Sequence, residues 1–254
     1  MQPPSMPPPA RGFAVVDVEA SGRSPWRHRV VEVGVVLLDY PLLRVEAEFS
    51  TLVDPGGPVG PTSVHRITQE HVAGAPNFRE IAPHLSDLLR GRILVGHHVT
   101  CDLGFLVREF ARIGVAVPDA PTLCTMALAG RVLGDQLPGR SLGACTAAFG
   151  LPDFPAHTAL GDARATARLL RCCLGTPAGG VEPVRAMIEG AQRAVWPKLR
   201  RRSAAVHTQN RSVLPAALPA APPTAPVTPG AYAVPCAVPY GVPAPGPAAR
   251  REWA

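Results

Sequence analysis

Short apolar runs alternate with turn-rich segments through the first fifty residues of the chain. Three such runs, rich in β-branched residues, cover residues 13–18, 29–39 and 45–53. Runs of this length and composition predict β-strands. Because the segments between them are short and contain proline, we expect the three strands to be antiparallel neighbours.

Apolar residues then recur at helical spacing. Residues 102–113 give the strongest pattern, with Leu103, Leu106, Val107 and Phe110 on one face. The other helices are predicted after a Thr68 cap, from an Asn77 cap through residue 89, and over residues 123–133, 141–149 and 159–174. A brief buried strand is expected over residues 93–95. Three strands followed by alternating helix and strand indicate a mixed α/β sheet flanked by helices.

Proline is distributed unevenly along the 254 residues. Of 31 prolines, five lie in residues 1–10 and fourteen in residues 175–254, which leaves twelve in the 164 residues between. Proline-rich segments bury too little apolar surface to offset chain entropy. We therefore predict a folded domain over residues 11–174, a disordered N-terminus over residues 1–10 and a mostly disordered Pro/Ala-rich tail over residues 175–254.

The net charge of +6 belongs to that tail. Residues 1–174 carry sixteen arginines and sixteen acidic residues, whereas residues 175–254 carry nine basic and three acidic ones. A basic tail can bind a polyanion without reading its sequence, or it can simply keep the chain soluble. Both interpretations stay open.

Some classes of protein are excluded by simple counts. The six cysteines show no C-x-x-C spacing, so the common zinc and dithiol motifs are absent. No apolar run approaches the roughly 18 residues of a membrane span, and no signal segment is recognisable at the N-terminus. We expect a cytoplasmic protein with no membrane association.

Acidic residues interrupt the apolar pattern at the end of the first strand. Asp17 and Glu19 follow a run of four apolar residues. Residues i and i+2 of a strand share a face, so both carboxylates point the same way. Two like charges at a buried position are costly unless they are protonated or neutralised by a cation. A strand that merely ends at a polar turn is the alternative.

Two further acidic residues stand at predicted helix starts. Asp102 begins the helix predicted over residues 102–113, seven residues after the strand that ends at residue 95. Asp162 lies in the first turn of the last helix, five residues after His157. Each aspartate alone is explained by helix capping, and the histidine alone by a surface loop. Together with Asp17 and Glu19 they form a set of oxygen ligands that suits two Mg²⁺ or Mn²⁺ ions in phosphodiester hydrolysis.

Three segments resemble the motifs of the DnaQ-like 3′–5′ exonucleases. They are F-A-V-V-D-V-E-A-S-G at 13–22, L-V-G-H-H-V-T-C-D-L-G-F-L at 94–106 and H-T-A-L-G-D-A at 157–163. The His-x4-Asp spacing is that of the DEDDh subgroup, and V-H-R-I-T at 64–68 is similar to a further family segment. The resemblance covers about residues 11–174 and implies a ribonuclease H-like fold.

The resemblance also implies roles. Asp17 would bridge two metal ions, Glu19 and Asp102 would complete the coordination, Asp162 would hold the ion that carries the attacking water, and His157 would accept its proton. Substrate contacts are expected from Ala20, Ser21, Gly22, His65, His98 and Phe105, with packing as the open alternative for each. His98 stands where the family usually has Asn, Cys101 where it has Phe and Arg66 where it has Gly, so the shape of the substrate pocket is expected to differ.

The implied activity is a metal-dependent 3′–5′ exonuclease that releases nucleoside 5′-monophosphates from a single-stranded 3′ end. The family includes proofreading subunits, stand-alone DNA exonucleases and ribonucleases that trim RNA. DNA is favoured as the substrate, in replication proofreading or repair, and RNA trimming is the alternative. The tail offers a second hypothesis, an interaction module that tethers the domain to a DNA polymerase or clamp.

Overall fold

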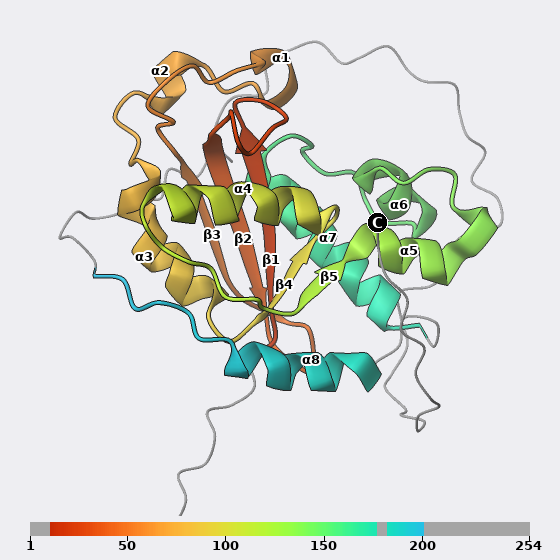
Figure 1. Cartoon of the computed structure of the whole chain (residues 1–254). Helices are drawn as coiled ribbons and strands as arrows, with labels where there is room; N and C mark the ends of the chain where they lie inside the picture. The colour runs from red at the N-terminus through yellow and green to blue at the C-terminus, as the bar shows by residue number, and fades with distance from the viewer. Residues whose placement is uncertain (1–10, 177–181, 201–254) are drawn as a thin grey trace, which may run out of the picture.

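A five-stranded mixed sheet lies at the centre of the computed structural model, which describes residues 11–176 and 182–200 (Figure 1). The strands are β1 (Phe13–Ala20), β2 (Val30–Leu38), β3 (Val45–Leu52), β4 (Ile93–Gly96) and β5 (Thr122–Cys124), in the order β3-β2-β1-β4-β5. β1, β2 and β3 pair antiparallel, as predicted. β4 pairs parallel to both β1 and β5, so the predicted mixed sheet is confirmed.

The helices agree with the sequence pattern in most places. They are α1 (Thr62–His65), α2 (Gln69–Val72), α3 (Phe78–Leu89), α4 (Val99–Arg112), α5 (Thr125–Leu133), α6 (Leu142–Ala148), α7 (Ala159–Leu174) and α8 (Glu182–Arg193). Asn77 caps α3 as expected: its side chain accepts from the Glu80 N–H, and the Glu80 carboxylate accepts from the Asn77 N–H at 2.9 Å.

Three details of the predicted elements were wrong. The segment predicted as a helix over residues 123–133 begins as the strand β5, because Thr122–Cys124 pair with β4, and α5 starts only at Thr125. A strand of three residues is too short to show a periodic pattern, and this one is stabilised by pairing with a strand distant in sequence. α4 begins three residues earlier than predicted, and the short α1 was not predicted.

Helices cover both faces of the sheet. Alternate residues of β1 point to opposite faces: Ala14 and Val16 pack with α3 and α4, whereas Phe13 and Val15 pack with α5, α6 and α7. On the first side Phe78 of α3 and Phe110 of α4 meet edge to face, with ring centroids 5.1 Å apart. The sheet is therefore packed between two apolar layers, and the acidic side chains of β1 lie at the carboxyl end of that strand.

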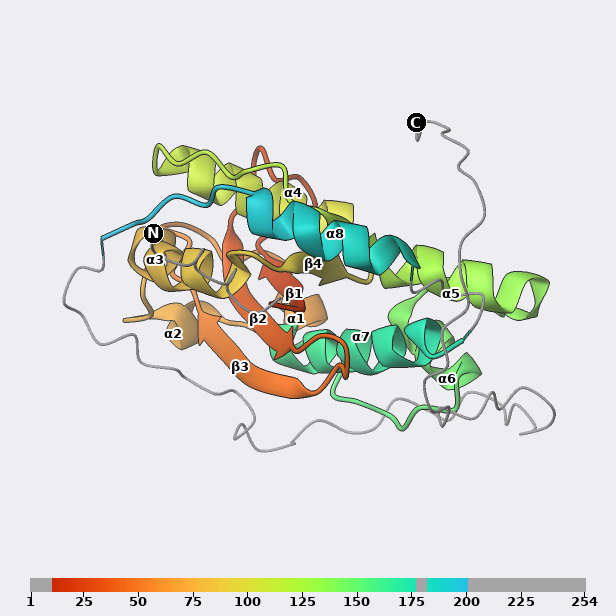
Figure 2. The ribbon, with the colours of Figure 1, turned by 90° about the horizontal axis from the view of Figure 1, so that it is seen from below.

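The packed part of the chain continues beyond residue 174, where the sequence pattern placed the end of the domain. In α8, Val184, Ile188 and Ala191 are buried, and Trp196 beyond it is 3% exposed. α8 crosses the end of the sheet opposite the β1–β2 loop (Figures 1 and 2). The proline content averaged over residues 175–254 concealed this amphipathic segment. The predicted disorder of residues 1–10 and 201–254 falls outside the described residues.

None of the helices in the described residues is both long enough and apolar enough to span a membrane.

Candidate active site

The carboxyl end of β1 carries the first two acidic side chains. Asp17 and Glu19 lie on the face of β1 that α7 covers, since they alternate with residues of the opposite face. Across the β1–β2 ladder, Asp17 is opposite Gly34 and Glu19 is opposite Glu32. This part of the sheet therefore presents three carboxylates and a glycine to the start of α7.

Gly34 lets α7 approach the sheet. A Cβ atom at this position would lie 2.3 Å from the backbone carbonyl carbon of Ala159, the first residue of α7. Any side chain at residue 34 would push the helix away. The close approach sets the first turn of α7, which includes Asp162, beside Asp17.

Asp102 reaches the same place from the other helical layer. β4 runs parallel to β1 and ends at Gly96, and α4 begins at Val99, so the first turn of α4 lies at the carboxyl edge of β1. There the Oδ1 atom of Asp102 accepts a hydrogen bond from the Val18 N–H at 3.2 Å. This bond holds the Asp102 carboxylate against the backbone of Val18, the residue between Asp17 and Glu19 in the sequence.

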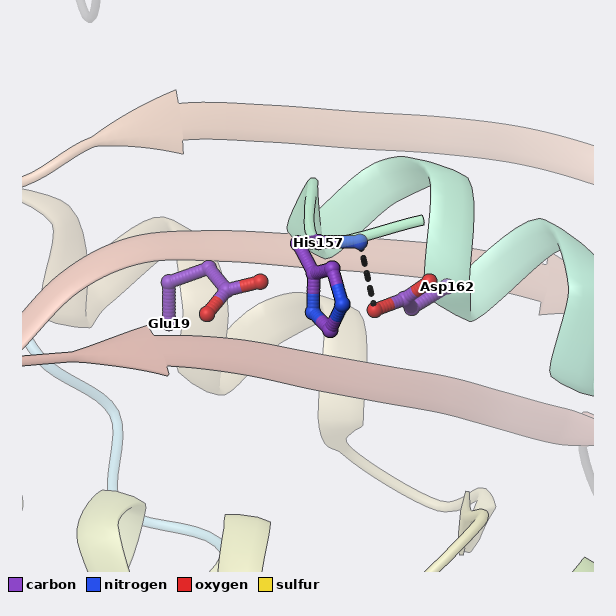
Figure 3. Close-up of side chains that lie close together, drawn as sticks. All are labelled: Glu19, His157 and Asp162. Atoms are coloured by element: carbon purple, nitrogen blue, oxygen red, sulfur yellow. Dashed lines mark hydrogen bonds between the residues drawn. The ribbon is translucent and has the colours of Figure 1, made fainter. Parts of the chain in front are cut away.

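His157 precedes α7 in an exposed loop. Its φ of 62° is left-handed, an uncommon conformation for a residue other than glycine. Its backbone N–H donates to Oδ2 of Asp162 at 3.2 Å. Figure 3 shows the imidazole between the carboxylates of Glu19 and Asp162, and one ligand atom from each of the three residues lies within 4.8 Å of the others.

The pKa values of the three aspartates in this cluster are raised because their side chains are partly buried and close together. Burial, and then the charges of Asp102, Asp162, Glu19 and Glu32, raise the pKa of Asp17 well above its ordinary value. Burial raises the pKa of Asp102 to about 7, against the hydrogen bond from Val18. Burial also raises the pKa of Asp162, while the backbone hydrogen bond and charge of His157 oppose that shift. Each shift reports a carboxylate that is costly to ionise.

A bound cation would relieve this cost, and the side chains fit one. Within residues 11–176 and 182–200, no arginine or lysine forms an ion pair with Asp17, Asp102 or Asp162. The Oδ1 atom of Asp162 is buried and has no hydrogen-bond partner. Carboxylate oxygens in this number are the ligands that hard divalent cations prefer.

Four of the expected substrate residues lie at this edge of the sheet. Ala20 ends β1, and Ser21 and Gly22 begin the β1–β2 loop, where the Ser21 hydroxyl accepts from the Arg29 N–H at 3.0 Å. His98 is exposed at the start of α4, with its Nδ1 atom 3.1 Å from the Cys101 sulfur. Their position leaves contact with a substrate open.

The other two expected substrate residues are packed inside the protein. Phe105 is 8% exposed and belongs to the apolar layer under α4. His65 is 1% exposed; its Nδ1 atom accepts from the Ile67 N–H and its Nε2 atom donates to the Val59 carbonyl. Of the two alternatives that the sequence left open, packing describes both residues in this structure.

Glu32 and Gly34 belong to the site but were not predicted from the sequence. Glu32 is 1% exposed, and its carboxylate accepts from the Ala159 N–H at 3.1 Å, at the N-terminus of α7 where negative charge is favoured. Both residues interrupt the otherwise apolar run from Val30 to Leu38. Those two interruptions in a buried strand were the signal that could have identified them.

A mixed sheet of this order, with acidic side chains from β1, α4 and α7 at one edge, defines the class as a ribonuclease H-like nuclease. The sequence model of the RNase T family, described as Exonuclease, matches residues 14–170. The chain belongs to this exonuclease family, whose DnaQ-like members are 3′–5′ exonucleases. The resemblance seen in the sequence is thereby confirmed, and the family depends on divalent metal ions.

Individual relatives show the same likeness. A DNA polymerase III subunit epsilon-like protein of Rhodobacter capsulatus is 37% identical over 160 residues, which cover 61% of this chain and 22% of that protein. Exonuclease X in complex with 5′ overhanging duplex DNA matches with a TM-score of 0.54 and 25% identity, over 69% of this chain and 99% of that one. The nuclease domain of a DEDDh family member bound to rAMP shares the fold, with a TM-score of 0.51, 20% identity and coverage of 72% and 95%.

The chain spans only part of its curated relatives, between 26% and 11% of the length of the first three.

Proposed function

We propose that the chain removes nucleotides one at a time from the 3′ end of single-stranded DNA and releases nucleoside 5′-monophosphates. Asp17, Glu19, Asp102 and Asp162 hold two divalent ions, Mg²⁺ or Mn²⁺, and His157 is the general base. The observation that supports these roles is the convergence of Glu19, His157 and Asp162 within 4.8 Å, beside two aspartates whose pKa values are raised.

Each side chain has a task that its place allows. Divalent ions bound here would lower the pKa of a bound water and stabilise charge on the departing 3′ oxygen. Asp17 faces the start of α7 from the sheet, so it is placed to contact ligands shared with Asp102 on one side and Asp162 on the other. The half-buried position of these groups holds them without rearrangement during the reaction.

His157 is suited to accept the proton of the attacking water. Imidazole is the group most often used as a general base near neutral pH. The backbone bond between His157 and Asp162 fixes the loop, and the exposed ring lies between the Glu19 and Asp162 carboxylates. The ring can therefore take a proton from a water at the carboxylates and pass it to solvent.

The similarity to an epsilon-like polymerase III subunit and to an exonuclease whose structure was solved in complex with DNA supports DNA as the substrate. The decisive assay is digestion of 5′-labelled and 3′-labelled single strands of DNA and RNA, with Mg²⁺, Mn²⁺ or EDTA in parallel. We expect the 3′ label to leave first as a mononucleotide, faster from DNA, and no release in EDTA. Faster release from RNA would refute DNA as the preferred substrate and favour an RNA-trimming enzyme. Metal-independent or endonucleolytic cleavage would refute the proposed reaction.

We further propose, from the names of the polymerase III relatives and the basic composition of residues 201–254, that the chain associates with a DNA polymerase or clamp in the cytoplasm during replication or repair. Co-sedimentation of the full chain with purified replicative polymerase and clamp, compared with a chain ending at residue 200, tests this association. Equal co-sedimentation of the two chains would refute a role for that segment.

A further inference from the structure

Trp26, in the loop between β1 and β2, is an exposed aromatic residue with a cation against it. The side chain is 74% exposed. The guanidinium of Arg108, from α4, lies over its ring. A cation on one face of an indole attracts the ring electrostatically and limits its motion. Because the residue is so exposed, the rest of its ring surface remains open to a ligand.

The loop around Trp26 is fastened to α4. The Arg112 guanidinium donates to the carbonyl oxygens of Pro25, Trp26 and His28, at 2.8, 3.2 and 3.2 Å. Arg29, at the end of the loop, pairs with Glu109 of the same helix through two hydrogen bonds of 2.7 and 2.9 Å. The indole therefore projects from a fixed support.

Positive charge surrounds this support. Arg23 and Arg27 are exposed in the loop, and no acidic residue occurs between residues 20 and 31. The one acidic residue of α4 near the loop, Glu109, is 1% exposed and is neutralised by arginines. A hollow of about 230 Å³ opens here, lined by Trp26, Arg108, Ala111 and Arg112. An aromatic ring among arginines suits a polyanion that also carries flat rings.

The support lies close to the candidate active site. The loop continues directly from β1, which carries Asp17 and Glu19. On α4, Asp102 and Arg108 are six residues apart, which corresponds to about 9 Å along a helix axis. Stacked nucleotides repeat about every 3.4 Å along a strand. A strand whose last phosphodiester lies at the carboxylates would bring the third or fourth nucleotide from its 3′ end to Trp26.

We propose that Trp26 is a stacking platform for a base of single-stranded nucleic acid, two or three nucleotides upstream of the bond that is cut, and that Arg23, Arg27 and Arg108 contact the adjoining phosphates. Proteins that bind single strands combine such rings and charges, because every base has a face to stack and every linkage a charge. The inference rests on the proposed function, since it places the same substrate on a second surface.

The test compares a long substrate with one that has no upstream nucleotide. Steady-state rates are measured for a ten-nucleotide single strand and for the p-nitrophenyl ester of thymidine 5′-monophosphate, in Mg²⁺. We expect Trp26→Ala to lower the ratio of kcat/KM for the decamer to kcat/KM for the ester by about 5- to 160-fold, the range for loss of one base–aromatic stack. The loss should fall on KM for the decamer, and Trp26→Phe should recover most of it.

Arg44→Ala is the matched charge control, because Arg44 is exposed in the turn between β2 and β3, at the other end of these strands. It should leave the ratio unchanged, whereas Arg27→Ala should lower it, and more so at low salt. Thermal unfolding verifies that each variant is folded. A ratio for Trp26→Ala equal to that of the unsubstituted chain overturns the platform. If the unsubstituted chain cleaves neither substrate, the proposed function itself has failed.

Discussion

Glu109 and the acidic residues at the carboxyl edge of β1 differ in whether neighbouring basic side chains neutralise their negative charge. Glu109 is 1% exposed and accepts hydrogen bonds from Arg29, Arg112 and the Val30 N–H. Asp17, Asp102 and Asp162 lie at the carboxyl edge of β1, where the described residues offer them no arginine or lysine pair. Arginines of the chain neutralise the charge of Glu109, whereas the three aspartates repel one another.

The difference separates structure from function. A buried ion pair whose partners are all supplied by the fold stabilises one arrangement of loop and helix. A group of acids with raised pKa values makes the metal-free fold less stable, and such groups concentrate at functional sites. If this comparison is right, substitutions at the two places should have opposite effects on stability and on activity.

The largest expected effect is the loss of hydrolysis in Asp17→Asn, because its carboxylate lies among all the others. In EDTA the same variant should melt at a higher temperature than the unsubstituted chain, since an amide removes the charge that burial and four neighbouring acids disfavour. Release of a 3′ label and thermal unfolding measure the two effects. Asp153→Asn, the same change at an exposed residue, is the control and should alter neither. Full activity in Asp17→Asn would remove Asp17 from the site.

His157→Ala should lower kcat by about 10²- to 10⁴-fold, through loss of the general base. Because the residue has a φ of 62°, part of any effect of alanine reflects backbone strain. His157→Asn separates the two causes, since asparagine adopts this conformation readily. Equal losses in both variants assign the effect to the imidazole. A wild-type rate with an intact acid limb of the pH–rate profile in either variant would contradict the role.

Glu109→Gln should reduce the free energy of unfolding by about 3 kcal/mol, because it leaves two arginines without their carboxylate. The value is at the lower end for a buried pair, since Arg29 is about a third exposed (36%). Urea denaturation measures it. The control is Glu48→Gln, because the Glu48 side chain is 31% exposed whereas that of Glu109 is 1% exposed, and a change below about 1 kcal/mol is expected. Similar losses of unfolding free energy in the two variants would mean that the ion pairs of Glu109 stabilise the fold no more than a surface ion pair does.

The sequence was most informative where local pattern and chemistry coincide. The three antiparallel strands and the long helices were predicted from periodicity. Asp17 and Glu19 were identified because they interrupt an apolar run, Asp102, Asp162 and His157 by their places at predicted helix starts, and the resemblance to the exonuclease family implied their roles. The structure brings these side chains to one edge of the sheet, while their roles stay predictions. β5 was missed because its three residues are a strand only through pairing with β4, which is distant in sequence. α8 was missed because the proline content averaged over residues 175–254 concealed its amphipathic pattern.

Burial was the part that could not be inferred from a single position. His65 and Phe105 were expected at the substrate, yet whether such a residue faces a ligand or the core depends on the packing of several elements. Glu32 and Gly34 act on α7 through contacts 127 and 125 residues away in the chain. The charge balance of Glu109 likewise depends on Arg29, eighty residues earlier.

The smallest expected effect is a pH dependence of stability that only the metal-free protein shows. Burial raises the pKa of Asp102 to about 7 and raises those of Asp17 and Asp162 above ordinary values. Between about pH 4 and pH 7 the folded chain therefore binds more protons than the unfolded chain, so this group's contribution to stability falls as pH rises. In EDTA the melting temperature should decrease by several degrees across that interval, and less so in Asp102→Asn. Added Mg²⁺ should restore it at pH 7.5, because an ion that binds only the folded chain stabilises it, and should have little effect on Asp17→Asn. A melting temperature in EDTA that rises steadily to pH 7, identically in both variants and the unsubstituted chain, would show that the acids at the end of β1 are as well balanced as Glu109.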